Sequence, residues 1–135
     1  VLPPYVYSTD WREMGAHVRA VLGATGLSCM LYNTPPAYTT DFLPEHVAEL
    51  ADAFDNLHAV KESSGDVRRI TALKARLGDR LALCVGLDDA VVEGVRAGAV
   101  GWVAGLVNAL PEASVALFER ARAGDDVDAL YAWFL

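Results

Sequence analysis

Short apolar runs alternate with amphipathic stretches along the whole chain, and this alternation restricts the fold more than any other feature. Continuous apolar runs of about four to eight residues are typical of strands buried on both faces of a sheet. Apolar residues at every third or fourth position are typical of helices that pack on such a sheet. The repeated order of strand and helix therefore predicts an α/β protein with a parallel sheet and helical crossovers. The predicted strands cover residues 1–5, 27–32, 57–60, 81–85 and 100–106.

Two architectures share this order of elements: an open doubly wound sheet and a (β/α)8 barrel, or TIM barrel. Successive predicted strands end about 25 residues apart, so eight units would need ~200 residues, the lower limit for the barrel. The chain has 135 residues, starts without a methionine and stops within a helical pattern, so the barrel requires about three further units before Val1. No glycine-rich nucleotide-binding motif, the usual mark of the open sheet, follows any strand. We therefore expect the last five units of a (β/α)8 barrel over residues 1–124, and the start of a C-terminal helical extension over residues 125–135.

Composition and charge limit the classes of partner. The chain contains 11 Lys and Arg residues and 18 Asp and Glu residues, which gives a net charge of −7. This acidic balance argues against nucleic acid or an anionic membrane as a partner, and no apolar run approaches the length of a membrane span. Cys29 and Cys84 lie inside apolar runs, so we expect free, buried thiols and a reducing, cytoplasmic location.

The sequence predicts no metal site. His17, His46 and His58 do not share ligand spacing with one another or with the cysteines, so structural roles are expected for all three. The chain also lacks a zinc motif, a phosphate-binding loop and the residue order of a Ser-His-Asp triad.

Lys61 is the residue that points most directly to chemistry. It comes directly after the strand predicted for residues 57–60, and active sites lie at the carboxyl ends of barrel strands. Burial disfavours the ammonium form of a lysine and lowers its pKa, and a neutral amine can attack a ketone to form a Schiff base. The alternative is a lysine that extends to solvent or pairs with Glu62.

Two tyrosines and several glycines occupy comparable positions. Tyr5 and Tyr32 each end a predicted strand, where a phenol could transfer protons to a reacting carbonyl or pack its ring in the core. Gly86, Gly101 and Gly105 could let a ligand approach the backbone, or could relieve crowding between strands. The pattern alone leaves both interpretations open.

Several segments resemble one known family. Residues 32–35 match a Tyr-Asn-x-Pro motif, and Lys61 follows Tyr32 by 29 residues within the matching segment 60–66. Residues 86–89 and 98–103 match later segments of the family, and residues 4–5 match the end of its fourth barrel strand. Over essentially all 135 residues, the sequence resembles the dihydrodipicolinate synthase / N-acetylneuraminate lyase family of class I aldolases.

The resemblance implies a homotetrameric (β/α)8 enzyme that acts on pyruvate or a related 2-oxo acid. It implies that Lys61 forms the Schiff base and that Tyr32 relays protons. Gly86, Val103 and Tyr5 would belong to the substrate pocket, Val103 through its backbone carbonyl. The protonated imine itself takes up electrons in this chemistry, so neither a metal ion nor an organic cofactor is expected. The expected partner is a small 2-oxo acid.

Two positions depart from dihydrodipicolinate synthase proper. Ala37 stands where that synthase has an arginine that binds the carboxylate of its aldehyde substrate, and Val6 stands where it has a second tyrosine. Residues 61–71, 98–110 and 131–134 look most like the branch that deaminates 1-pyrroline-4-hydroxy-2-carboxylate. Three alternatives stay open: 4-hydroxy-tetrahydrodipicolinate synthase itself, a sugar-acid aldolase or dehydratase and, from another class, a non-catalytic 2-oxo-acid-binding module on the same fold.

Overall fold

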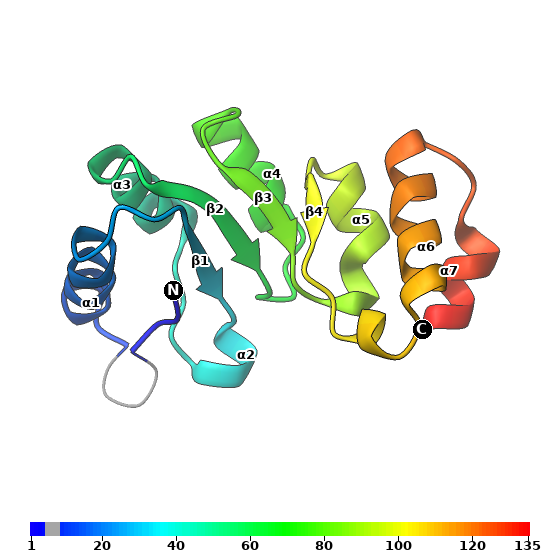
Figure 1. Cartoon of the computed structure of the whole chain (residues 1–135), viewed down its shortest axis with the longest axis horizontal. Coiled ribbons are helices and arrows are strands. Elements are labelled where there is room, and N and C mark those ends of the chain that lie inside the picture. Colours follow the sequence, from blue (N-terminus) through cyan, green and yellow to red (C-terminus); the bar gives the residue numbers. More distant parts are fainter. Residues whose placement is uncertain (5–8) are drawn as a thin grey trace.

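The computed structural model of the protein describes residues 1–4 and 9–135, and its centre is a parallel sheet (Figure 1). Within these residues, four strands pair in chain order. Every pair is parallel, so the carboxyl ends of the strands meet at one edge of the sheet. The parallel order predicted from the sequence is confirmed. The strands are β1 (Cys29–Asn33), β2 (Leu57–Glu62), β3 (Ala82–Val85) and β4 (Gly101–Trp102).

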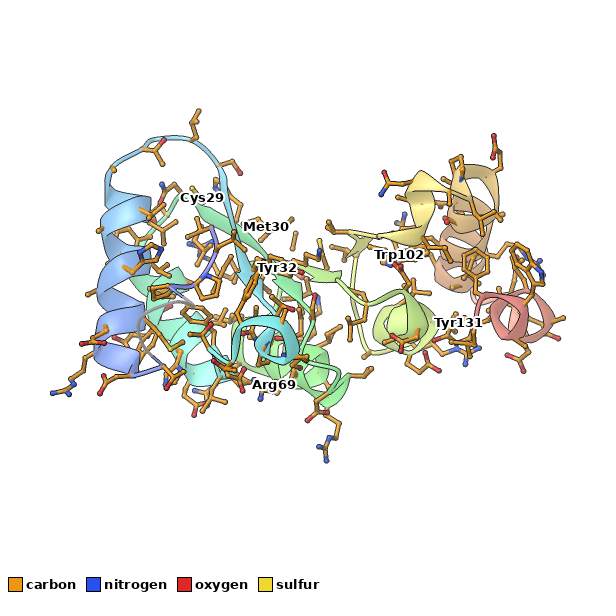
Figure 2. All side chains as sticks on the ribbon, turned by 90° about the horizontal axis from the view of Figure 1, so that it is seen from below. Cys29, Met30, Tyr32, Arg69, Trp102 and Tyr131 are labelled. Carbon is orange, nitrogen blue, oxygen red and sulfur yellow. The ribbon has the colours of Figure 1, made fainter. Side chains whose placement is uncertain are left out.

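Helical segments precede, connect and follow the strands, and α3, α4 and α5 lie along one side of the sheet (Figure 2). None of the helices within the described ranges is both long and apolar enough to cross a membrane. The helical segments are α1 (Trp11–Gly23) before β1; α2 (Pro35–Tyr38) and α3 (Pro44–Ala53) between β1 and β2; α4 (Arg68–Leu77) between β2 and β3; η1 (Asp88–Ala90) and α5 (Val91–Arg96) between β3 and β4; and η2 (Leu106–Asn108), α6 (Pro111–Ala123) and α7 (Asp128–Phe134) after β4.

The main core lies between the sheet and the helices, and it follows from alternation along the strands. Leu31, Val60 and Leu83 are register partners on β1, β2 and β3, and they are buried in this core. Because successive side chains of a strand point to opposite faces, Tyr32 and Lys61 project from the other side of the sheet. The helices complete the core with apolar stripes that include Val47, Leu50, Ile70 and Leu73.

The segment before residue 5 lies beside β1. Val1 N donates to Met30 O at 2.6 Å, and the N–H of Tyr32 donates to Val1 O at 2.9 Å, which is the pattern of a parallel bridge. Residues 1–4 are not a regular strand. The predicted strand over residues 1–5 is therefore represented here by one bridging residue, and its end at Tyr5 lies outside the described residues.

The prediction of a strand over residues 100–106 is wrong in its length. Only Gly101–Trp102 pairs as a strand, because β3 ends at Val85 and offers no longer ladder. The N–H groups of Gly105 and Leu106 instead donate to the carboxylate of Asp88, at 3.1 and 2.9 Å, and the chain turns into η2.

A second, smaller core holds the C-terminal helices together. Tyr131 of α7 anchors it: its hydroxyl lies 2.7 Å from both the carbonyl oxygen of Asp89 and Oε2 of Glu93. The segment predicted as a C-terminal extension thus contains a helix, α7, that packs on α5 and α6. The buried members of this core are Val91, Val92, Leu117, Ala121, Val127 and Tyr131.

Candidate active site

The paired ends of β1 and β2 bring Tyr32 and Lys61 together. The two residues are register partners, and Lys61 Nζ lies 4.2 Å from the centroid of the Tyr32 ring. Both side chains are half-buried. An amine and a phenol thus share one site at the carboxyl edge of the sheet, which is the edge where active sites of barrel proteins lie.

Gly86 follows β3 and lies directly against Lys61. A Cβ built on Gly86 would lie 2.6 Å from Lys61 Cε and 1.8 Å from Ser63 Oγ, both far closer than atoms can approach. The site therefore requires a residue without a side chain at position 86. Of the two interpretations left open by the sequence, relief of crowding between strands applies here, because the groups that occupy the space are the side chains of Lys61 and Ser63.

Ser63 is not among the predicted site residues, although it lies at the centre of the site. It is 1% exposed, and its Oγ has no hydrogen-bond partner among the described residues. It is close enough to the Tyr32 phenol to lower the pKa of that group. The signal in the sequence was its position two residues after Lys61, since alternate residues of an extended segment share a face.

The surroundings of Tyr32 lower the pKa of its phenol. Burial is the largest influence on the pKa of Tyr32 and raises it, but the hydroxyl of Thr34 and the charge of Lys61 act in the opposite direction. Together these groups outweigh burial, so the pKa of the phenol lies below its ordinary value of about 10. A phenol with a lowered pKa releases its proton more readily, which suits a group that carries protons.

Of the five residues predicted for the site, the structure brings three together: Lys61, Tyr32 and Gly86. Val103 follows β4 at the same edge of the sheet, two strands away from Lys61, and is 39% exposed. Tyr5 lies outside the described residues.

The histidines have contacts of other kinds. Within residues 1–4 and 9–135, no three His, Cys, Asp or Glu side chains gather as metal ligands. His58 lies 2.8 Å from Ser28 Oγ, His17 lies 3.2 Å from a backbone carbonyl, and the ring of His46 stacks on Trp11 with centroids 4.1 Å apart. Both cysteines are free thiols; Cys84 is buried as the sequence predicts, whereas Cys29 is only half-buried.

Comparison with known proteins identifies a family and several relatives of this chain. Residues 1–132 match the Dihydrodipicolinate synthetase family. A 4-hydroxy-tetrahydrodipicolinate synthase of Xanthomonas campestris pv. campestris is 38% identical over 133 residues, which are 98% of this chain and 43% of that protein. A probable 5-dehydro-4-deoxyglucarate dehydratase of Saccharopolyspora erythraea is 35% identical over 131 residues, which are 95% of this chain and 41% of that protein.

Solved structures match the fold. The dihydrodipicolinate synthase of Acinetobacter baumannii, crystallised with pyruvate, superimposes with a TM-score of 0.89 at 27% identity, over 97% of this chain and 45% of that one. The chain therefore spans less than half the length of these relatives and forms the corresponding part of a (β/α)8 barrel. Since the family match extends over nearly every residue, this chain belongs to the dihydrodipicolinate synthetase family.

Proposed function

We propose that this chain carries the Schiff-base site of a lyase or aldolase that acts on pyruvate or a related 2-oxo acid. The observation that carries the proposal is the Lys61 amine, held 4.2 Å from the centre of the Tyr32 ring at the carboxyl edge of the sheet. An amine in this position can bond to a ketone, and the neighbouring phenol can move the protons that the reaction requires. A relative crystallised with pyruvate adds support.

In the proposed reaction, the neutral Nζ of Lys61 attacks C2 of the 2-oxo acid, and a C–N bond forms as the carbonyl π bond breaks. Tyr32 carries a proton from the nitrogen to the oxygen, which gives a carbinolamine. Tyr32 then passes a second proton, taken up from solvent, to that oxygen, which leaves as water, and a protonated imine remains on Lys61. The imine withdraws electrons from the adjacent carbon, so a bond there can break or form without a metal ion or an organic cofactor.

Ala37 limits which second substrate can react after the imine has formed. It lies on α2, five residues after Tyr32, and is exposed. Its methyl group cannot pair with a carboxylate as an arginine does, so condensation of pyruvate with aspartate semialdehyde should be poor. Loss of water or ammonia from a larger 2-oxo acid fits better, either as a sugar-acid dehydratase, the activity named for the Saccharopolyspora relative, or as the hydroxyproline-pathway deaminase. Condensation at the rate of a lysine-pathway synthase would contradict this part of the proposal.

Borohydride trapping tests the Schiff base directly. The protein that carries this sequence is incubated with pyruvate and sodium borohydride, and peptide mass spectrometry locates the reduced adduct. Lys61 and Lys74 are the only lysines of the chain, and Lys74 pairs with Asp79 at the surface of α4, so Lys74→Ala is a matched control. We expect the adduct on Lys61, its retention in Lys74→Ala, and its loss in Lys61→Ala together with at least about 10³-fold of turnover.

The same experiment separates the alternatives. An unlabelled Lys61 in a protein that turns over its substrate would reject the Schiff base. Binding of the 2-oxo acid with neither adduct nor turnover would favour a non-catalytic binding module. We also propose that the protein is cytoplasmic, from its free cysteines, and that it is a homotetramer, from the family resemblance. Light scattering would measure the mass of the assembly.

A further inference from the structure

A second set of polar side chains lies directly behind the Tyr32–Lys61 pair, on the other side of the sheet. Asn33 follows Tyr32 on β1, Glu62 follows Lys61 on β2, and the two are register partners. Because side chains alternate along a strand, Asn33 and Glu62 point toward the helices. Both are almost completely buried, with 0% and 5% of their surfaces exposed.

The amide of Asn33 joins two carboxylates. Its Nδ2 donates to Glu62 Oε2 at 3.0 Å and to Asp41 Oδ1 at 3.1 Å, and its Oδ1 accepts the N–H of Phe42 at 2.9 Å. The other carboxylate oxygen of Glu62 accepts the N–H of Ser64 at 2.6 Å. The ends of β1 and β2, and the loop that follows each of them, are therefore joined through side chains as well as through the backbone ladder.

Arg69 of α4 offsets one of the two negative charges of this cluster. Its guanidinium donates to both oxygens of Asp41 at 2.7 Å, and the charge of Glu62 also acts on it. Figure 2 shows Arg69 next to the helices and Tyr32 over the sheet. Removal of a carboxylate from water is costly, and apolar residues of similar size often give a more stable core. The presence of Glu62 beside the reacting pair therefore points to alignment rather than to stability alone.

We propose that Glu62 is a positioning residue that acts through Asn33: the two side chains clamp the ends of β1 and β2 so that the Tyr32 phenol stays against the Lys61 amine. This inference rests on the proposed function for the reactive roles of Tyr32 and Lys61. A shift of one strand end by about 1 Å would move the phenol away from the amine, and displacements of that size reduce turnover by about 100-fold.

Glu62→Gln tests the clamp at nearly constant size. It replaces one oxygen with an NH₂ group, so the side chain can no longer accept hydrogen bonds from both Asn33 and Ser64 in the same way. The first measurement is the spectrophotometric titration of Tyr32, taken as the difference between each protein and the same protein with Tyr32→Phe. Burial raises the pKa of Tyr32, whereas Thr34 and the charge of Lys61 lower it further than burial raises it. We therefore expect the pKa to rise in Glu62→Gln, as phenol and amine separate.

The second measurement is steady-state turnover of the 2-oxo acid. We expect kcat to fall about 10- to 100-fold in Glu62→Gln while KM stays within about 3-fold, because the lost alignment acts on the chemical step. Asp66→Asn is the matched control, since Asp66 is a carboxylate in the loop after β2 that also accepts an N–H, that of Arg68 at 3.1 Å. It should change neither the titration nor kcat.

Arg69→Lys provides a second variant if Glu62→Gln does not fold. It keeps the charge but loses the two-point contact with Asp41, and smaller changes in the same directions are expected. An unchanged Tyr32 titration with unchanged kcat, in whichever variant folds, would overturn the inference. A wild-type protein whose Lys61 is not trapped by borohydride would refute the proposed function instead, and the titration, which needs no substrate, would still decide whether Glu62 positions Tyr32.

Discussion

The two ends of the sheet differ in the hydrogen bonds that link their buried polar side chains to one another. At the β1–β2 end, Asn33 and Glu62 are buried and both oxygens of Glu62 accept hydrogen bonds. Buried polar atoms without a hydrogen-bond partner among the described residues occur at both ends: Thr40 Oγ1 and Ser63 Oγ at the first, and Trp102 Nε1 and Ser114 Oγ at the β4–α6 end. Figure 2 shows Tyr32 at the first of these ends and Trp102 at the second.

The two ends also differ in the size of their apolar cores. The main core packs on β1, β2 and β3, whereas a smaller cluster joins α5, α6 and α7. Exposed large apolar side chains occur at both ends: Leu27, just before β1, is 75% exposed, and Val100 and Val115, at the second end, are 55% and 59% exposed. Lys61 and Tyr32, the side chains proposed to react, therefore lie where buried hydrogen bonds join the ends of β1 and β2. The β3–β4 side contributes room for them, above all through Gly86.

The largest effect should come from the first end. Tyr32→Phe keeps the ring against which Lys61 lies but removes the group proposed to carry protons. Turnover should fall by ~10²–10⁴-fold, while some Lys61 adduct still forms on borohydride trapping. Tyr131→Phe removes a hydroxyl at the second end and should leave turnover unchanged. An equal loss of turnover in Tyr32→Phe and Tyr131→Phe would show that the two ends of the sheet do not differ in their importance for the reaction.

Gly86→Ala should have the next largest effect. The new methyl group would overlap the side chains of Lys61 and Ser63, so we expect the rate of adduct formation to fall about 10- to 100-fold and the free energy of unfolding to fall by about 1–3 kcal/mol. Gly26→Ala is the control, because nothing lies within 4 Å of its Cβ position. Trapping rates and urea unfolding of the two variants measure the contrast, and similar behaviour would show that Lys61 does not need the space above position 86.

The order of the strands and the edge where chemistry gathers could be predicted, because both follow from short-range patterns. Apolar runs in the sequence predict β1, β2 and β3. A polar residue at the end of such a run lies at the shared carboxyl edge, and this reasoning predicts the positions of Lys61 and Tyr32. The last strand could not be predicted in length, since its extent depends on where β3 ends and on the Asp88 carboxylate, which lies 17 residues before Gly105.

The cluster behind the site could not be predicted for a similar reason. Asn33 and Glu62 are 29 residues apart, and Asp41 and Arg69 are 28 residues apart. No local pattern marks either pair, because an Asn or Asp in a loop has many possible partners. Register places Asn33 beside Glu62, and register is known only once the sheet is built.

A smaller effect should appear in the pH dependence of stability. Burial raises the pKa of Asp41, but the hydrogen bonds from Arg69 and Asn33 outweigh burial, so the pKa lies below its usual value. A carboxyl group whose pKa is lowered on folding stabilises the protein above its unfolded pKa of about 3.9, and this stabilisation is lost as the pH falls through the folded pKa. Asp41→Asn should thus lower the free energy of unfolding by about 1–2 kcal/mol at pH 7, and by less at pH 3.

Urea unfolding of the wild type and Asp41→Asn across this pH range measures the difference. Asp66→Asn is the control, since the Asp66–Arg68 pair is exposed, with 36% and 90% of the two side chains accessible, and exposed pairs contribute little. A constant gap between wild type and Asp41→Asn from pH 7 to pH 3 would mean that the charge of Asp41 does not carry the effect.

The smallest effect should come from the second end, at Ser114. Its hydroxyl is buried on α6 without a partner among the described residues, so Ser114→Ala removes an unsatisfied polar group and introduces the residue with the highest helix propensity. The free energy of unfolding should stay the same or rise by up to about 1 kcal/mol. Tyr131→Phe, which removes a hydroxyl 2.7 Å from Glu93 Oε2, should lower it by about 1–2 kcal/mol in the same assay. If Ser114→Ala destabilises the protein as much as Tyr131→Phe, the Ser114 hydroxyl has a hydrogen-bond partner in solution.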